Sequence, residues 1–455
     1  MNHQRTLVSS LALLAAALMA PENVVIANAP STGVTTTQTL MNVSAGAGLP
    51  LTAATLYSSL TGNGTGDIPW ITTIESTRGS LLPAGTLNAL RFTASYDTPG
   101  FDVGDAGDNV VATVMKNGVA TALSCTVTGI TGAANKEEQC GVVPAVVDPP
   151  VTVAQGDRLT LRIVTTGTPA TNGMATWSVD FTPGIPNTTA MAGMHSTLTS
   201  ARWLPPGVSS HGSGAFASGA SDLEGRVYIP IAGTITGVLC RSDSRRATSV
   251  KVEVIINGTR DSNLDCLVAR ADDTNAVAIA ATRSVAAGDT ISLRYAGDGA
   301  AGFLFATLLF EPTATGQWWV GSSSGPAIAY GSADVLMPLA GYRGTSCPRN
   351  HACSWWPPPN VNIDTVRVDL GTPPTGAQAL RVFIARHIED PPSSGSTIET
   401  ALSCAFAAGG SSTCQDTDAL SVDAVHADDY WQIASRPGGV ANATTLKVST
   451  VFSRD

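Results

Sequence analysis

Charged residues are scarce in this sequence, at 13% of 455 residues. Long amphipathic helices need charged and amide side chains on the face that contacts water, so this scarcity argues against a helical protein. The formal net charge is −10, and no basic face is available to neutralise phosphates. Nucleic acid is therefore not expected as a partner.

The sequence also lacks a second long apolar run and any zinc-binding spacing. Beyond the N-terminus, no apolar segment approaches the ~20 residues that a spanning helix needs, so the mature chain should not cross a membrane. Phe303–Phe310 is apolar apart from Thr307 and reads as a buried strand. The eight cysteines include no CxxC pair and have no histidine at ligand spacing, which argues against zinc.

The N-terminus has the pattern of an export signal. One Arg lies within Met1–Arg5, Thr6–Ala20 is uncharged and rich in Leu and Ala, and Ala27-Asn28-Ala29 is a cleavage candidate. Because proline follows Ala29, the cut site stays open. An N-terminal helix of a cytoplasmic or virion protein is the alternative, but the pattern favours a signal peptide over residues 1–29 and a secreted or cell-surface protein.

The cysteine spacing agrees with export. An even number of cysteines behind an export signal favours disulfides over free thiols, although sequence alone does not prove their connectivity. Four local pairs are expected: Cys125 with Cys140, Cys240 with Cys266, Cys347 with Cys353, and Cys404 with Cys414.

The stretch from Val111 to Ile163 shows how the chain is built. Alternating apolar and polar residues flank Asn117-Gly118, which is a strong hairpin signal. A second pair of extended runs surrounds a turn at Gly156-Asp157, where glycine suits a positive φ and the aspartate can accept backbone N–H groups. Short strands joined by such turns favour an all-β fold.

This stretch belongs to a degenerate internal repeat. The pentapeptide Thr121–Cys125 is identical to Thr400–Cys404, and the Gly156-Asp157 turn returns at Gly288-Asp289 and, in weaker form, at Asp428-Asp429. An apolar-Pro-Ala-Gly element occurs at Leu82–Gly85, Ile229–Gly233 and Met337–Gly341, and runs containing tryptophan at Trp70, Trp203 and Trp318 are taken to open the copies.

About eight strands in each copy predict three tandem antiparallel β-sandwiches of jelly-roll type. The expected boundaries are 30–67 for an extended arm or linker, then 68–185, 198–312 and 316–455 for the sandwiches. The period is too long for a solenoid, so separate beads joined by linkers near Pro183–Thr197 and Glu311–Gln317 are expected.

These elements together resemble tandem jelly-roll modules of bacterial surface and phage fibre proteins, whose sandwiches look like those of the C1q/tumour-necrosis-factor group. The resemblance covers about residues 68–453. It implies adhesion or assembly, with self-association or other surface proteins as partners, and it brings no catalytic residues.

The insertion Cys347–Pro359 carries the groups best suited to recognition. A small disulfide ring containing Arg349 and His351 precedes Trp355 and Trp356, and paired indoles offer a stacking surface for a glycan or peptide. The alternative is that the tryptophans pack beneath the loop or against a neighbouring copy.

Two further motifs match patterns of a calcium site and of a hydrolase nucleophile. Asp102, Asp105 and Asp108 crowd oxygen donors into one loop, so calcium is the one cofactor considered, although acidic loops are mostly solvated. Gly321–Gly325 satisfies the GxSxG pattern of a serine hydrolase with Ser323 as nucleophile, but Pro326 and the Gly/Ser context argue against it. No enzyme activity is expected.

The sequence therefore favours a secreted, non-enzymatic structural or adhesion protein. A subunit of a virion fibre or an extracellular filament is the first alternative. A carbohydrate-binding protein that uses Trp355 and Trp356 is the second.

Overall fold

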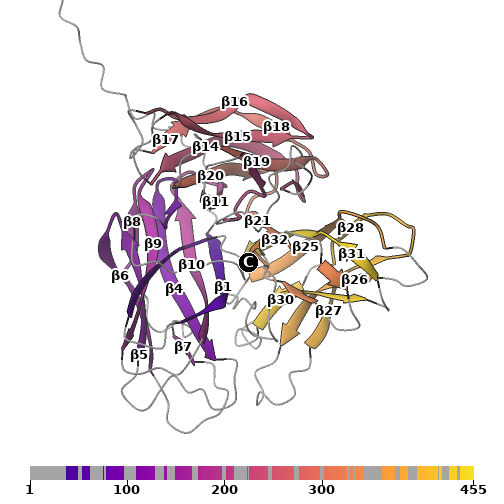
Figure 1. The fold of residues 1–455 in the computed structure, drawn as a ribbon, viewed down its shortest axis with the longest axis horizontal. Coiled ribbons are helices and arrows are strands. Elements are labelled where there is room, and N and C mark those ends of the chain that lie inside the picture. The colour runs from indigo at the N-terminus through magenta and orange to yellow at the C-terminus, as the bar shows by residue number, and fades with distance from the viewer. Residues whose placement is uncertain are drawn as a thin grey trace, which may run out of the picture.

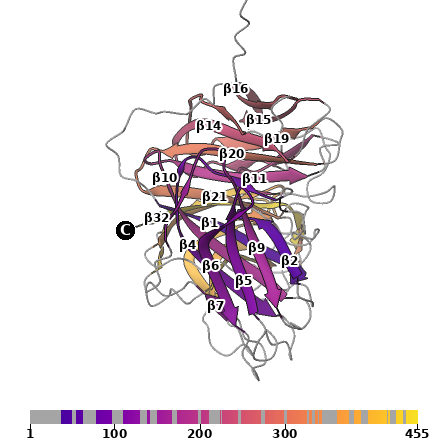
Figure 2. The ribbon, with the colours of Figure 1, turned by 90° about the vertical axis from the view of Figure 1, so that its left-hand side faces the viewer.

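The computed structural model contains strands, turns and short irregular connections, and no α-helix occurs in the part of the chain that it describes (Figures 1 and 2). Within those residues, no helix is long and apolar enough to span a membrane. The structure describes residues 37–454 except for 50–53, 62–74, 76–77, 97–108, 129–137, 141–148, 167–172, 197–200, 210–222, 224, 244–247, 271–275, 298–301, 325–327, 331–334, 338, 343–360, 375–379, 388–396, 419, 423–429 and 438–440.

The first sandwich consists of two antiparallel sheets with the orders β1-β10-β4-β7 and β2-β9-β5-β6. Short β8 extends the first sheet beside β4, and β3 extends the second beside β9. The strands are β1 (Gln38–Leu49), β2 (Ala54–Ser59), β3 (Ser80–Leu81), β4 (Gly85–Tyr96), β5 (Asn109–Lys116), β6 (Val119–Thr128), β7 (Glu138–Cys140), β8 (Val151–Val153), β9 (Arg158–Thr166) and β10 (Gly173–Pro183).

The second sandwich repeats this plan with the orders β11-β20-β14-β17 and β12-β19-β15-β16. Here β18 pairs with β14 and β13 pairs with β19. The strands are β11 (Thr189–Ser196), β12 (Arg202–Leu204), β13 (Val227–Tyr228), β14 (Gly233–Ser242), β15 (Val250–Ile256), β16 (Thr259–Val268), β17 (Val277–Ile279), β18 (Arg283–Val285), β19 (Thr290–Ala296) and β20 (Phe303–Pro312).

The third sandwich has the orders β24-β21-β32-β25-β28 and β23-β30-β26-β27, with β29 beside β25 and a separate β22-β31 pair. Its strands are β21 (Gln317–Ser323), β22 (Ile328–Tyr330), β23 (Val335–Met337), β24 (Gly341–Tyr342), β25 (Val361–Leu370), β26 (Leu380–His387), β27 (Thr397–Phe406), β28 (Thr413–Asp416), β29 (Leu420–Val422), β30 (Tyr430–Pro437), β31 (Ala441–Thr444) and β32 (Leu446–Arg454).

All three sandwiches share one strand order. If the eight strand positions are lettered B to I along the chain, one sheet runs B-I-D-G and the other C-H-E-F in every copy. This is the order of a jelly roll, and it confirms the predicted fold class. The F positions are β6, β16 and β27, which lie at outer edges of the C-H-E-F sheets.

The predicted arm and the linker predicted near Pro183–Thr197 are wrong, whereas a short connection does lie between β20 and β21 near the second predicted linker. The segment 30–67 supplies β1 and β2, and β1 pairs with β10 in the register Gln38↔Phe181. The segment expected to link the first two sandwiches contains β11, which is strand B of the second. Only a short corner joins β10 to β11, where the buried Asn187 has φ 53° and its amide donates to the carbonyl of Pro312 at 2.8 Å.

The repeated pentapeptide has a structural explanation. Thr121 and Thr400 begin it, and their hydroxyls donate to the carbonyls of Val114 and Ile384 respectively, both at 2.7 Å. Each of these carbonyls belongs to the residue at a register shift in the neighbouring E strand, where the ladder skips a partner. The leucine of the motif then enters the core and the cysteine forms a disulfide.

The Asn-Gly hairpin and the Gly-Asp turn are joined by a clasp in the first two sandwiches. The Asn117 amide donates to Asp157 Oδ1 at 2.6 Å, and the Asn257 amide donates to Asp289 Oδ1 at 2.9 Å. The second aspartate oxygen accepts a backbone N–H three residues earlier, at 2.8 Å in both copies. The predicted turn role of these aspartates is therefore confirmed, whereas Asp428-Asp429 lies outside the described residues.

Replacement of Asn257 by alanine is expected to raise the pKa of Asp289 toward 3.8, because the hydrogen bond from Asn257 is the largest cause of its lowered value. Since the pKa of Asp289 is lowered in the folded protein, the clasp stabilises the protein fully above the ordinary pKa of 3.8. This stabilisation is lost as the pH falls through the lowered pKa. Carbon-detected NMR titration would measure the change. Asn263→Ala, at an exposed site on β16, is the control, and an unshifted Asp289 would contradict the expectation.

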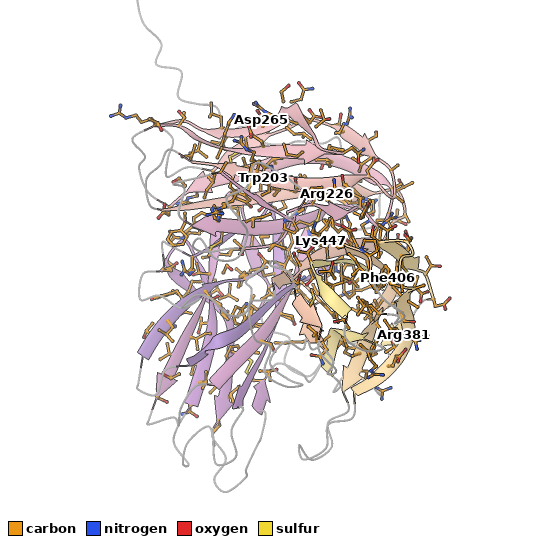
Figure 3. All side chains as sticks on the ribbon, turned by 45° about the vertical axis from the view of Figure 1, so that its right-hand side comes forward. Trp203, Arg226, Asp265, Arg381, Phe406 and Lys447 are labelled. Atoms are coloured by element: carbon orange, nitrogen blue, oxygen red, sulfur yellow. A yellow bond between two sulfur atoms is a disulfide. The ribbon has the colours of Figure 1, made fainter. Side chains whose placement is uncertain are left out.

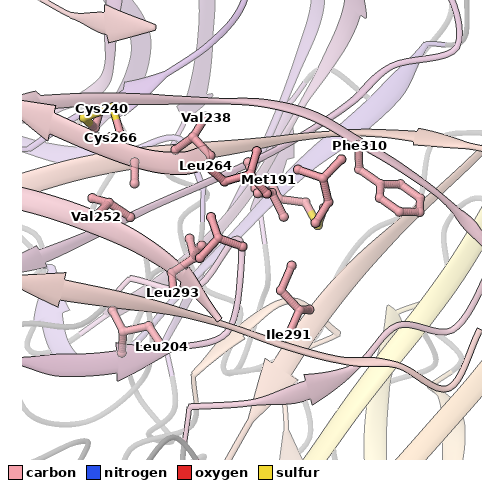
Figure 4. Close-up of a cluster of buried hydrophobic side chains, with 14 of the residues drawn as sticks. Met191, Leu204, Val238, Cys240, Val252, Leu264, Cys266, Ile291, Leu293 and Phe310 are labelled. Atoms are coloured by element: carbon pink, nitrogen blue, oxygen red, sulfur yellow. A yellow bond between two sulfur atoms is a disulfide. The ribbon is translucent and has the colours of Figure 1, made fainter. Parts of the chain in front are cut away.

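Each sandwich has its own apolar interior. Figure 4 shows that of the second, where Cys240 and Cys266 lie at one end of a cluster that includes Val252, Leu264 and Leu293. The predicted buried strand Phe303–Phe310 is confirmed as β20. The tryptophan runs, in contrast, are not equivalent: Trp203 lies on strand C of its copy and Trp318 on strand B.

Candidate functional site

The residues predicted to bind a ligand cannot be placed. Arg349, His351, Trp355 and Trp356 lie outside the described residues, as do Asp102, Asp105 and Asp108, and the glycan and calcium hypotheses stay predictions. In the part of the chain that the structure describes, no three side chains of His, Cys, Asp or Glu are grouped so as to hold a metal ion.

Ser323, the candidate nucleophile, lies at the end of β21 and is fully buried. It pairs with Lys447 of β32, and the ladder continues through Ser324, whose backbone N–H donates to the carbonyl of Leu446 at 2.7 Å. A hydrolase nucleophile needs an exposed position on a sharp turn from a strand into a helix. Ser323 has neither the exposure nor the turn.

Three of the four predicted disulfides are present, and each connects the two sheets of one sandwich. Their Cα–Cα distances are 5.6 Å for Cys125–Cys140, 6.1 Å for Cys240–Cys266 and 5.7 Å for Cys404–Cys414. In every case one cysteine lies on strand F, and its partner lies on strand G or D of the opposite sheet. Cys347 and Cys353 lie outside the described residues.

The most developed polar arrangement lies where the three sandwiches meet, which we call the junction. At its centre, Asp180 on β10 accepts two hydrogen bonds from Arg91 on β4, both at 3.2 Å. Arg454, at the end of β32 in the third sandwich, contacts the same carboxylate at 2.7 Å. The hydroxyl of Thr39 donates to Asp180 at 3.0 Å and accepts from Arg454 at 3.2 Å.

The carboxylate of Asp180 is almost completely shielded from water, with 8% of its side chain exposed. Burial by itself would raise its pKa, but the charges and hydrogen bonds of Arg91 and Arg454 outweigh burial and hold the pKa below 3.8. Asp180 is therefore ionised at neutral pH and ties the first sandwich to the last strand of the third.

A second set of contacts joins the first and second sandwiches. The Gln38 side chain donates to the carbonyl of Ala190 at 3.0 Å and accepts its N–H at 2.8 Å, so that β1 binds the backbone of β11. Thr61 donates to the carbonyl of Ala192 at 2.8 Å. The Arg78 guanidinium lies 4.8 Å from the centre of the Phe303 ring, and burial lowers its pKa to about 10.

The apolar core of the second sandwich also includes two side chains of the third, Trp319 and Val451. Adjacent tryptophans on β21 belong to different cores: Trp318 stacks on Phe452 within the third sandwich, whereas Trp319 packs with Phe310 of the second, at a centroid distance of 6.0 Å. Both indoles are almost completely buried. Trp319 therefore fills a space in the neighbouring sandwich.

Polar contacts surround this apolar joint. Lys447 donates to the carbonyl of Leu223, and Figure 3 shows Lys447 between the second and third sandwiches. The Arg367 guanidinium lies 4.6 Å from the centre of the Tyr228 ring. Burial raises the pKa of nearby Asp369, and the positive charges of Lys447, Arg226 and Arg367 only partly oppose this.

A narrow crevice penetrates the junction and is lined by all three sandwiches. Its walls include Gln38, Leu40 and Thr61 from the first, Met191 from the second, and Trp318 and Val320 from the third. Its polar lining residues are Gln38, Thr39, Thr61 and Thr189, most of the others are apolar, and no charged side chain lines the crevice. The geometry of the crevice suits a structural joint between the sandwiches.

Comparison with known proteins gives only weak structural similarities. No family model and no curated protein matches the chain. Among solved structures, it is similar to a triple jelly roll from an archaeal turreted virus, at 12% identity over 82% of this chain and 80% of that one, with a TM-score of 0.19. It is also similar to the major capsid protein P2 of bacteriophage PM2, at 13% identity, 61% and 98% coverage, and a TM-score of 0.17.

A third similar structure comes from infectious bursal disease virus, at 8% identity over 94% of this chain and 83% of that one, with a TM-score of 0.15. At these scores the chains do not superpose closely. The strand order supports the resemblance drawn from the sequence at the level of the jelly roll, and the likeness to C1q/tumour-necrosis-factor modules stays a prediction.

The junction residues could not be found from the sequence. Gln38 and Thr39 lie in a Thr-rich segment with little periodicity, and Asp180 and Arg454 stand alone in strands without a motif. The one available signal was the pair Trp318-Trp319, since two adjacent indoles in a strand must point to opposite faces. A strand with apolar groups on both faces is buried on both sides.

Proposed function

We propose that this chain is a secreted, non-enzymatic structural protein of the cell surface or extracellular space, in which three jelly-roll sandwiches act as one rigid building block. The observation that carries the proposal is the insertion of Trp319 from the third sandwich into the core of the second. Modules on flexible linkers can move and bind independently of one another. Sandwiches whose cores are joined form a rigid unit that resists deformation.

The disulfides support the extracellular part of the proposal. Disulfides form and persist in oxidising compartments and are rare in the cytosol. Three bridges connect opposite sheets, each starting from the same place on strand F of its sandwich, which favours a structural role over a redox one. Together with the signal-like N-terminus, they favour export.

A block of this kind acts through its partners. Further copies of the chain or other surface proteins are the partners we propose, and a virion or filament subunit is the same proposal in a different setting. Binding of a glycan by Trp355 and Trp356 would add recognition to the block, and quenching of tryptophan fluorescence by a glycan panel, lost in Trp355→Ala/Trp356→Ala, tests it.

Expression with and without a working signal tests the main proposal. The exported protein is expected to begin near Pro30, to show no thiol that reacts without reduction, and to have a native mass above that of one chain. Leu13→Arg, which places a charge in the apolar run, should retain the protein inside the cell. Export that does not depend on this run, or reactive thiols in the folded protein, would contradict the proposal.

A further inference from the structure

The three F strands are equivalent edges with different chemistry. β6, β16 and β27 each end one C-H-E-F sheet and carry a disulfide cysteine at the same place, namely Cys125, Cys266 and Cys404. An edge strand presents backbone N–H and C=O groups that can pair with another chain, and proteins usually protect such edges. In Figure 1, β6, β16 and β27 lie at the left, the top and the lower right of the molecule.

Charged side chains protect the β16 edge. Arg260 is exposed and contacts Asp265 of the same strand, and its Nε lies 3.3 Å from Glu253 on β15. Asp261 lies 3.7 Å from Arg283 on β18. A strand brought against β16 would have to desolvate these groups, so β16 is a poor edge for pairing.

The β27 edge is protected by one directed hydrogen bond. The backbone N–H of Ser403 donates to Asp416 on β28 at 2.8 Å, so this edge donor is already occupied. Glu399 at the start of the strand is held by Arg381 and Arg436. Asp416 stands two residues after Cys414, whereas the residue two places after Cys140 in the first sandwich is Val142, which has no carboxylate.

Among the residues that the structure describes, the β6 edge shows neither protection. Val119–Thr128 contains no charged residue, no proline and no glycine, although it is ten residues long. Along its second half Leu123, Cys125 and Val127 face the core, while Ser124, Thr126 and Thr128 are exposed. Because the chain carries a net charge of −10, two copies repel one another over most of their surfaces, and an uncharged strand is where they approach at least cost.

The β6 edge is also held rigid at both ends. The clasp between Asn117 and Asp157 fixes the hairpin turn that precedes it, and the disulfide Cys125–Cys140 fixes its second half to the opposite sheet. An edge that is already ordered loses little conformational freedom when it pairs. Figure 2 shows β5, β6 and β9 on the side of the molecule that faces away from the third sandwich.

We propose that the β6 edge is an assembly surface that pairs antiparallel with the β6 edge of a second copy of this chain. Two C-H-E-F sheets then form one continuous sheet about a two-fold axis, which is the symmetry that an antiparallel pair of identical strands requires. This inference rests on the proposed function as a building block, and it names the surface and the partner.

Three matched lysine variants test the pairing. Thr126, Leu267 and Ala405 are exposed and each directly follows the F-strand cysteine of its sandwich. In sedimentation analysis of the exported protein, Thr126→Lys is expected to weaken self-association by about tenfold or more, because like charges meet across the paired edges. Leu267→Lys and Ala405→Lys should associate like the unmodified protein.

A charge-reversal mixture separates pairing from misfolding. Thr126→Lys and Thr126→Asp, each weak alone, should associate when mixed, since opposite charges then face one another. If Thr126→Lys self-associates as strongly as the unmodified protein, the proposed β6 pairing is overturned while the proposed structural function stands. An exported protein that stays monomeric at every concentration would overturn both, and equal loss in all three lysine variants would also overturn the edge.

Discussion

Replacement of Trp319 by alanine is expected to lower the free energy of unfolding by about 3–5 kcal/mol, the usual cost of truncating a buried tryptophan. The indole is fully buried in the core of the second sandwich although its backbone belongs to the third. Its loss should therefore also weaken the connection between the two. Calorimetry should show the third sandwich melting apart from the rest, whereas the unmodified protein should unfold with its sandwiches coupled.

Trp318→Ala provides the matched control for this prediction. Trp318 is the neighbouring residue on β21 and is equally buried, but it stacks on Phe452 in the core of its own sandwich. A similar loss of stability without the separation of transitions is expected. If both variants gave the same unfolding profile, the coupling role of Trp319 would be refuted.

Replacement of Asp180 by alanine is expected to cost about 3 kcal/mol or more of unfolding free energy, because it leaves Arg91 and Arg454 without their shared buried partner. Denaturant unfolding at neutral pH would measure this cost. Arg381→Ala is the control, since Arg381 is half exposed in its pair with Glu399 and should contribute less than about 1 kcal/mol. Equal losses of unfolding free energy in the two variants would show that the buried ion pairs of Asp180 stabilise the protein no more than an exposed pair does.

The same carboxylate predicts how the protein responds to acid. Since the pKa of Asp180 in the folded protein lies below 3.8, its stabilising effect is complete above that ordinary value and is lost as the pH falls through the lowered pKa. The difference in stability between the unmodified protein and Asp180→Asn should therefore be constant near neutral pH and shrink in strong acid. A difference that shrinks already between pH 7 and pH 5 would assign the effect to another group.

Local features of this protein were predictable from the sequence because local chemistry decides them. Asn117-Gly118 and Asn257-Gly258 adopt positive φ and form tight hairpins wherever they stand between strands. Gly156 and Gly288 do the same at the second turn, and each following aspartate closes its own turn. The three disulfides that the structure describes join cysteines that neighbouring strands bring together, so short spacing was a sound guide.

The sequence by itself determined an all-β chain with three copies of one strand pattern, because turn residues and alternation act over a few positions. Only the tertiary structure decided that β1 and β11 are strands of sandwiches, since their partners lie far away along the chain. It alone decided that Trp318 and Trp319 serve different cores and that Asp180, Thr39 and Arg454 meet. Residues that bury one sandwich against another carry the same polar or apolar character as ordinary surface and core residues, and only packing reveals which partner they contact.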